Sequence, residues 1–252
     1  MRTHRCVAAA VAAAGIGIIA NMAEAAEIKV LSSAAFREAY NELVPAFEHA
    51  SGHKVSTTWA GTVDIMKRMQ ADERFDLIIM SRQGLEELIA RGKVAAGSRV
   101  DLAKSGVGIA VRAGAPKPDV GSTEALKRTL MAAKSIGYST GPSGVYLAGL
   151  FQRMGIADAI QPKVKQAPPG VAVGSLIVNG EAEIGFQQVS ELILYPGIDY
   201  VGPLPPEIQE ITVFAAGVPA SGENREPARA LVDFLTAPAA VPLIKSKGLE
   251  PG

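Results

Sequence analysis

The distribution of apolar residues along the chain predicts alternating strands and helices. Runs such as Phe75–Met80, apolar except for Asp76, indicate buried strands, whereas Phe36, Tyr40 and Leu43 recur every three or four positions, as on one face of a helix. The same pattern predicts strands at 28–31, 55–59, 75–80, 105–111, 135–138, near 164, at 183–186 and at 211–215, with helices between them and two closing helices. This alternation predicts an α/β fold with mainly parallel sheets.

Small and hydroxyl-bearing residues follow three of the predicted strands, each just before a helix. They occupy Ser32–Ala35, Ala60–Thr62 and Ser139–Gly144. Each loop alone is explained by helix capping. In open α/β sheets, however, ligands bind outside the carboxyl ends of the strands. The three loops together therefore predict a cleft that holds a small anion with N–H and O–H donors.

The third loop does not match the common nucleotide or hydrolase motifs. No Lys-Ser/Thr pair follows Gly144, and the glycines at 137, 141 and 144 do not have G-x-G-x-x-G spacing. The second glycine of Gly141–Gly144 also comes one position too early for G-x-S-x-G. We expect no cofactor.

The first 25 residues are typical of a secretory signal peptide. Arg2 and Arg5 precede an apolar run, and Ala23–Ala25 fits a small-x-small cleavage site. We therefore expect a periplasmic protein that begins at Ala26. Its only cysteine, Cys6, would be removed with the signal, which excludes disulfides and thiol catalysis.

Charge and histidine content exclude further classes of function. The 25 Lys and Arg residues balance the 25 Asp and Glu residues, and no basic run is present, so nucleic acid is not an expected partner. His49 and His53 are four positions apart, but no third ligand is near them in the sequence. We interpret them as surface residues and predict no metal site.

Five segments of the chain resemble the ABC-type molybdate-binding periplasmic proteins, in the family's order and spacing. They are "IKVLSSAAFREAY", "WAGTVDIMKRMQADERFDLIIMS", "IGYSTGPSGVYLAGLFQRMGI", "VNGEAEIGFQQVSEL" and "ALVDFLTAPAAVPLIKSKGL". The resemblance implies a two-lobed periplasmic binding protein fold of type II. Lobe one would comprise 26–105 and 213–252, lobe two 106–212, and the hinge strands would lie near 106–111 and 211–215.

The same resemblance implies ligand-binding positions. The family's first-loop serine aligns with Ala35, its second-loop serine with Thr62, a backbone contact with Ser143, and its binding tyrosine with Gln188. Ser32 and Ser33 lie just before Ala35 and are further candidates.

The two altered positions favour an organic carboxylate over molybdate. Arg82, at the end of a predicted strand, could pair with a carboxylate through two parallel hydrogen bonds; a solvated surface arginine is the alternative. We therefore predict a monomeric solute-binding protein that holds a small anion. An ABC permease of the inner membrane is compatible with this function as its partner.

The alternative function is that of the aconitate isomerases, which resemble this same family. Their allylic proton shift needs no cofactor, only a base and groups that stabilise negative charge. Tyr138, Glu38 or Glu191 could be that base, and the sequence does not separate the binding protein from the isomerase.

Overall fold

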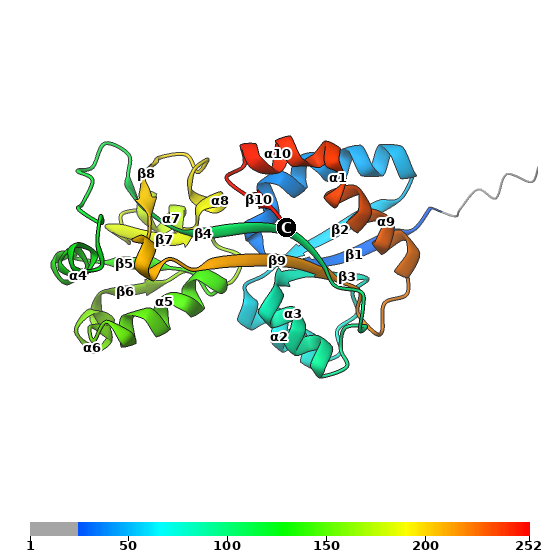
Figure 1. Ribbon diagram of the computed structural model, residues 1–252, viewed down its shortest axis with the longest axis horizontal. Coiled ribbons are helices and arrows are strands. Elements are labelled where there is room, and N and C mark those ends of the chain that lie inside the picture. Colours follow the sequence, from blue (N-terminus) through cyan, green and yellow to red (C-terminus); the bar gives the residue numbers. More distant parts are fainter. Residues whose placement is uncertain (1–24) are drawn as a thin grey trace, which may run out of the picture.

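The structure, a computed structural model, describes residues 25–252. The predicted signal peptide lies outside the described residues apart from Ala25. The described chain forms two lobes joined by long strands (Figure 1).

Lobe one, as we define it here, is built around three parallel strands. β1 lies between β2 and β3, and both neighbours run parallel to it. Its elements are β1 (Glu27–Ser32), α1 (Arg37–Ser51), β2 (Lys54–Trp59), α2 (Thr62–Gln70), β3 (Leu77–Ser81), α3 (Arg82–Ala90), α9 (Arg225–Thr236), α10 (Val241–Ser246) and β10 (Glu250–Pro251), with the 3-10 turns η1 (Ala34–Phe36) and η4 (Pro238–Ala240).

Lobe two repeats this arrangement with shorter strands. β5 pairs in parallel with β6 and β7. Its elements are α4 (Thr123–Ala132), β5 (Ile136–Tyr138), α5 (Pro142–Arg153), α6 (Ala157–Ile160), η2 (Gln161–Lys163), β6 (Val164–Gln166), α7 (Val173–Val178), β7 (Ile184–Gln188), α8 (Val189–Leu192), β8 (Ile198–Pro203) and η3 (Pro206–Ile208).

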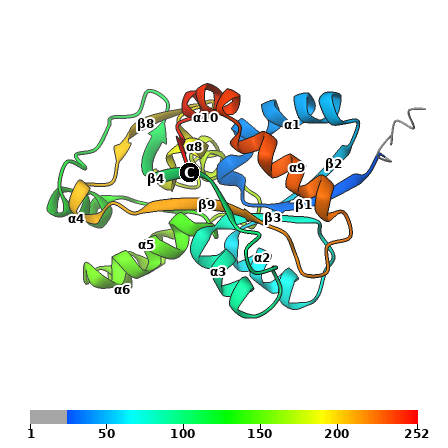
Figure 2. The ribbon, with the colours of Figure 1, turned by 45° about the vertical axis from the view of Figure 1, so that its right-hand side comes forward.

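Two antiparallel strands run from one lobe to the other. β4 (Val100–Arg112) pairs with β9 (Ile211–Gly217) up to Gly106 and with β7 from Val107 onward. The sheet order is therefore β2-β1-β3-β9-β4-β7-β5-β6, with β8 and β10 also paired to β4. Beneath β9, α5 of lobe two lies across a groove from α2 and α3 of lobe one (Figure 2).

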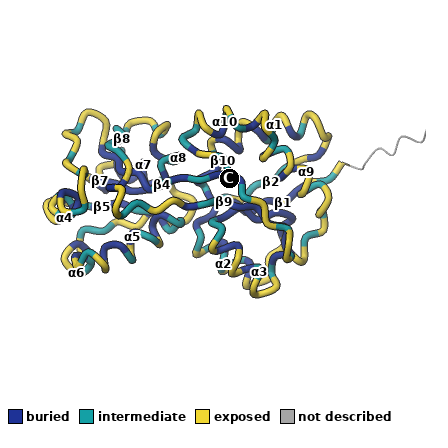
Figure 3. The backbone as a smooth tube through the Cα atoms, viewed as in Figure 1, coloured by how far each residue is buried: buried dark blue, intermediate teal, exposed yellow. Residues whose placement is uncertain are grey.

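Each lobe has its own apolar interior, and buried residues follow the strands (Figure 3). Within residues 25–252 no single helix is both long and apolar enough to cross a membrane. Two consecutive segments, α9 and Pro238–Ser246, are long and apolar enough only when taken together, and the chain bends by 53° between them. Their apolar residues Leu231, Leu235 and Ile244 lie in the core of lobe one.

The predicted strands and the longer helices are confirmed, with ends shifted by a few residues. The apolar pattern did not predict β8, β10 or the single-turn helices α6 and α8. His53 was wrongly placed at the surface: it is buried, and its Nδ1 accepts a hydrogen bond from the backbone N–H of Ala26 at 3.2 Å.

Candidate functional site

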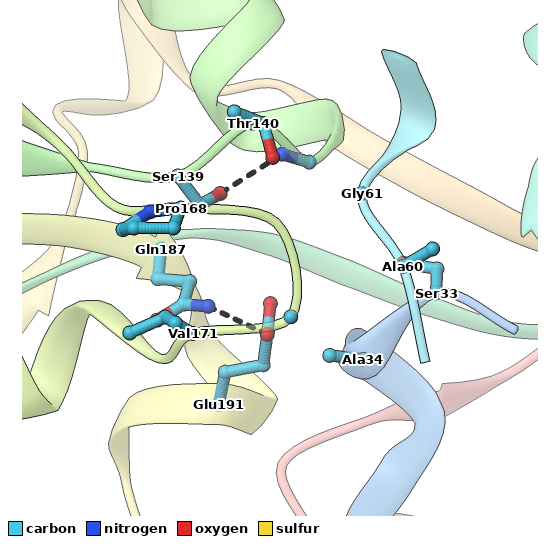
Figure 4. Close-up of a pocket in the computed structure, with 12 residues that line it drawn as sticks. Ser33, Ala34, Ala60, Gly61, Ser139, Thr140, Pro168, Val171, Gln187 and Glu191 are labelled. Carbon is cyan, nitrogen blue, oxygen red and sulfur yellow. Dashed lines mark hydrogen bonds between the residues drawn. The ribbon is translucent and has the colours of Figure 1, made fainter. Parts of the chain in front are cut away.

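A narrow cavity lies between the two lobes, where loops at the strand ends face each other. The space open to the centre of a water-sized sphere is about 20 Å³, roughly room for one water molecule between the lobes as they stand. Lobe one and lobe two supply opposite walls (Figure 4). The lining residues are Ser33, Ala34, Ala60, Gly61, Ser139, Thr140, Gly141, Pro168, Gly170, Val171, Gln187 and Glu191.

Two helices from different lobes begin at this cavity. Gly61 is the N-cap of α2 and Gly141 is the N-cap of α5, and neither helix has a side-chain cap. The first N–H groups of a helix have no acceptor within the helix, and its dipole is positive at that end. The cavity is therefore bordered by unpaired donors suited to an anion.

Glycine is required where the lobes approach each other. A Cβ at Gly61 would lie 2.4 Å from the Thr140 Oγ1 atom and 3.1 Å from the Thr140 carbonyl oxygen across the cleft, so even an alanine there requires Thr140 to move. In addition, the Ser190 hydroxyl of α8 donates to the Ala35 carbonyl of η1 at 2.8 Å. Ser190 is buried, so this bond between the lobes is shielded from water.

The first turns of α2 and α5 each carry a buried hydroxyl without a partner. Among residues 25–252, the Oγ1 of Thr62 and the Oγ of Ser143 make no hydrogen bond. An unsatisfied buried polar atom costs about 1–3 kcal/mol, and in native structures it calls for an explanation. Both hydroxyls lie within one helical turn of the N-cap residues that line the cavity, Gly61 and Gly141.

One acidic side chain, Glu191, projects into the wall that lobe two forms (Figure 4). Its Oε1 accepts a hydrogen bond from Gln187 Nε2 at 2.6 Å, and the Gln187 Oε1 accepts from Val173 N–H at 2.8 Å. Burial raises the pKa of Glu191 to about 7, although the positive charge of Arg37 and the bond from Gln187 act in the opposite direction. Near neutral pH this carboxyl group can therefore both accept and donate a proton.

Arg37, the first residue of α1, is not among the lining residues but stacks on Trp59 beside them. Its guanidinium carbon is 4.8 Å from the centroid of the Trp59 ring, and its charge acts on the Glu191 carboxyl group. Trp59 ends β2, directly before the cavity residue Ala60.

The structure brings some predicted site residues to the cavity and separates others from it. Ser33 lines it; Ser32 is buried behind it and donates to the Ser33 carbonyl at 3.1 Å. Thr62 and Ser143 do not line it: both lie in the first turns of helices whose N-caps do, and Thr62 borders the groove between α3 and α5. Ala35 joins the lobes through its carbonyl.

Gln188 and Arg82 lie elsewhere. The Gln188 side chain is fully buried between the crossing strands, beside the Thr212 hydroxyl at 3.0 Å. Arg82 forms a bidentate ion pair with Asp101, and it borders the groove between α3 and α5 rather than the cavity. Among the described residues, no three His, Cys, Asp or Glu side chains gather as they would around a metal ion.

The sequence analysis did not predict Arg37 as a site residue. Its position could have indicated a role, because a cation in the first turn of a helix opposes the helix dipole and is unfavourable there without another interaction.

Comparison with known proteins identifies the relatives of the chain. Residues 28–250 match the family model described as bacterial extracellular solute-binding protein. An aconitate isomerase from a Pseudomonas species is 39% identical over 230 residues, which covers 89% of this chain and 87% of that protein. The molybdate-binding protein ModA of Azotobacter vinelandii is 28% identical over 245 residues, covering 94% and 95%.

The fold matches solved structures of the same kind. The periplasmic molybdate-binding protein of Azotobacter vinelandii superposes with a TM-score of 0.74 at 19% identity, over 89% of this chain and 99% of that one. The two-lobed type II fold expected from the sequence is thereby confirmed.

Proposed function

The chain belongs to the family of bacterial extracellular solute-binding proteins, and we propose that its cleft binds a small organic polycarboxylate and shifts a proton along it, as an aconitate isomerase. The observation that carries this proposal is the carboxyl group of Glu191 in the wall of a cavity otherwise bordered by anion-binding donors. The similarity to an aconitate isomerase over most of both chains supports it.

An acidic side chain is a disadvantage in a site that only binds anions. Its charge repels the ligand, and its burial without a cationic partner in contact costs free energy. A general base, by contrast, works best when its pKa is near the operating pH. The pKa of Glu191, raised to about 7 by burial, meets that requirement.

The proposed reaction is an allylic proton shift. The Glu191 carboxylate takes a proton from the methylene carbon of aconitate, whose C–H electron pair forms a new C=C bond. The former double bond moves its electron pair to its far carbon, and Glu191 returns the proton there. One C–H bond breaks and one forms, and no electron is gained or lost. The conformation at the methylene carbon during deprotonation decides between the cis and trans products.

The remaining groups hold the carboxylates. The N-termini of α2 and α5 and the hydroxyls of Ser33, Thr62 and Ser143 would supply donors to oxygen atoms of the ligand, and they would stabilise charge that develops in the allylic intermediate. Ala35 and Gln188 offer no donor to the cavity, which supports a preference for carboxylates over molybdate. Arg82 has no ligand contact in this proposal, because Asp101 already occupies its guanidinium group.

The second candidate is a binding protein that delivers its anion to an ABC permease without changing it. The similarity to the molybdate-binding protein ModA favours this candidate. In both cases we propose a monomer in the periplasm, with lobes that hinge near 106–111 and 211–215. N-terminal sequencing of protein from an osmotic-shock fraction tests the location: Ala26 as first residue is expected, and Met1 in the cytosol would contradict it.

Two measurements test the proposed function. Thermal shift with molybdate, tungstate, sulfate, citrate and both aconitates ranks the ligands, since a ligand at a hundred times its Kd stabilises by about 2.7 kcal/mol. Incubation with trans-aconitate, followed by chromatography, detects the cis isomer.

Glu191→Gln should bind aconitate but isomerise it about 10²–10⁴ times more slowly. Glu181→Gln, at an exposed position, is the matched control. Stabilisation by molybdate alone would refute the isomerase, and full turnover by Glu191→Gln would refute Glu191 as its base.

A further inference from the structure

Arg37 is packed against aromatic side chains, and no acidic group within residues 25–252 pairs with it. Its guanidinium group stacks on Trp59 at 4.8 Å, and Trp59 in turn packs edge-on against Tyr40, with ring centroids 5.4 Å apart. The Tyr40 hydroxyl is hydrogen-bonded to the Thr57 hydroxyl at 2.9 Å. This chain of contacts within lobe one fixes the orientation of Arg37 before any ligand binds.

Within the described chain, no side-chain hydrogen bond engages the guanidinium group of Arg37. Its Nε atom is buried and has no partner among residues 25–252, where Arg37 also forms no ion pair. Arg82 shows the contrast, since Asp101 occupies both its Nε and a terminal nitrogen. A guanidinium group presents donors that match a carboxylate in a bidentate geometry. A half-buried, oriented arginine that has no acidic partner in the described chain therefore lacks the anion that its donors fit.

We infer that Arg37, stacked on Trp59, binds one carboxylate of the ligand and selects polycarboxylates over compact oxyanions. The inference rests on the proposed function and deepens it. A tetrahedral oxyanion can be held by the N-termini of α2 and α5 alone, whereas a tricarboxylate extends further and reaches Arg37. Arg37 directly follows η1, whose Ala35 carbonyl accepts the hydrogen bond from Ser190, the residue before Glu191, so a carboxylate bound to Arg37 carries its adjoining carbon toward the base.

Calorimetric titration of the full chain with trans-aconitate, citrate and sulfate tests this inference. Arg37→Gln should raise the Kd for the two tricarboxylates by about 10- to 100-fold, as expected for charge-assisted bonds, and change the Kd for sulfate less than threefold. Arg37→Lys keeps the charge without the bidentate geometry and should recover part of the loss. Arg82→Gln is the matched control and should leave all three affinities within threefold of wild type.

A pH profile separates ligand binding from a merely structural role. Arg37 lowers and Glu38 raises the pKa of Glu191, so the loss of the Arg37 charge should move the midpoint of kcat/KM toward higher pH. Circular dichroism shows whether each variant folds, and Arg37→Lys answers the question if Arg37→Gln does not. Equal losses for sulfate and tricarboxylates, or no loss at all, would overturn the inference.

Turnover of aconitate by the wild type tests the proposed function separately from these affinities. Tricarboxylate binding that depends on Arg37, without turnover by the wild type, would refute the isomerase and keep the inference. Turnover by the wild type with unchanged binding by Arg37→Gln would do the reverse.

Discussion

Replacing Glu191 by Gln should make the protein more stable at alkaline pH and abolish one component of its pH dependence. The substitution keeps the size of the side chain, and the introduced amide oxygen can still accept the hydrogen bond from Gln187 Nε2. It removes only the possibility of a negative charge in the cavity wall. Any change in stability that varies with pH therefore reports on ionisation of Glu191.

The magnitude follows from the pKa of Glu191, which burial raises from 4.5 to about 7. Between these two values the folded protein holds a proton that the unfolded chain has released. The contribution of Glu191 to the free energy of unfolding is therefore complete below pH 4.5 and declines as pH rises to about 7. At about 1.36 kcal/mol per pH unit the full difference is about 3 kcal/mol. Partial access of solvent through the cavity reduces it to about 2–3 kcal/mol.

Urea unfolding at pH 5 and pH 8, followed by circular dichroism, measures this difference. Relative to wild type, Glu191→Gln should gain about 2 kcal/mol or more between the two pH values. Other titrating groups contribute equally to both proteins and cancel in the comparison. Glu181→Gln should show no such gain. A gap between wild type and Glu191→Gln that stays constant with pH would show that Glu191 ionises normally, and the assignment of the base would lose its physical ground.

Three further substitutions test the closed cleft and its scaffold. Gly61→Val should weaken ligand binding more than tenfold without unfolding lobe one, because its side chain would meet Thr140; unchanged affinity, by calorimetry, would argue against the close approach. Ser190→Ala should weaken binding several-fold by removing the bond of about 1 kcal/mol to the Ala35 carbonyl, and equal affinity would show that this bond does not favour closure. Asp76→Asn should cost about 1–3 kcal/mol at pH 7 and less at pH 3 in urea unfolding. Burial alone would raise the pKa of Asp76, but hydrogen bonds from three backbone N–H groups lower it. The stabilisation that the Asp76 carboxylate contributes is therefore lost as pH falls. A cost of Asp76→Asn that does not change with pH would contradict this.

The elements that could be predicted from sequence are those whose pattern is local. Apolar runs and helical periodicity identified the parallel strands and the longer helices of both lobes. β8 could not be found in this way, because it ends at Pro203 and its residues are only half-buried. Its partner β4 precedes it by some ninety residues, and such pairing is not visible in a local pattern.

The site residues, too, could be predicted only where their pattern is local. The three small-residue loops did mark the cavity, since strand ends in a parallel sheet meet at one edge. Arg82 sits at such an edge as predicted, but Asp101, nineteen positions later, pairs with it. For Gln187 and Gln188, the alternation of side chains along a strand implies that only one faces the cleft. The structure places Gln187 there, a distinction that needed the direction of the strand.

The charges around Glu191 finally connect ligand binding to its ionisation. A polycarboxylate that occupies the cavity adds negative charge beside Glu191 and neutralises Arg37, the group that now lowers its pKa. Both effects raise the pKa of Glu191 further in the complex, so binding should take up a proton. Affinity for trans-aconitate should therefore fall as pH rises from 6 to 8, while it should stay nearly constant in Glu191→Gln. Calorimetry in buffers of different ionisation enthalpy measures the proton uptake directly. Binding without proton uptake at pH 7 would mean that the ligand lies away from Glu191, and the proton shift would then need another base.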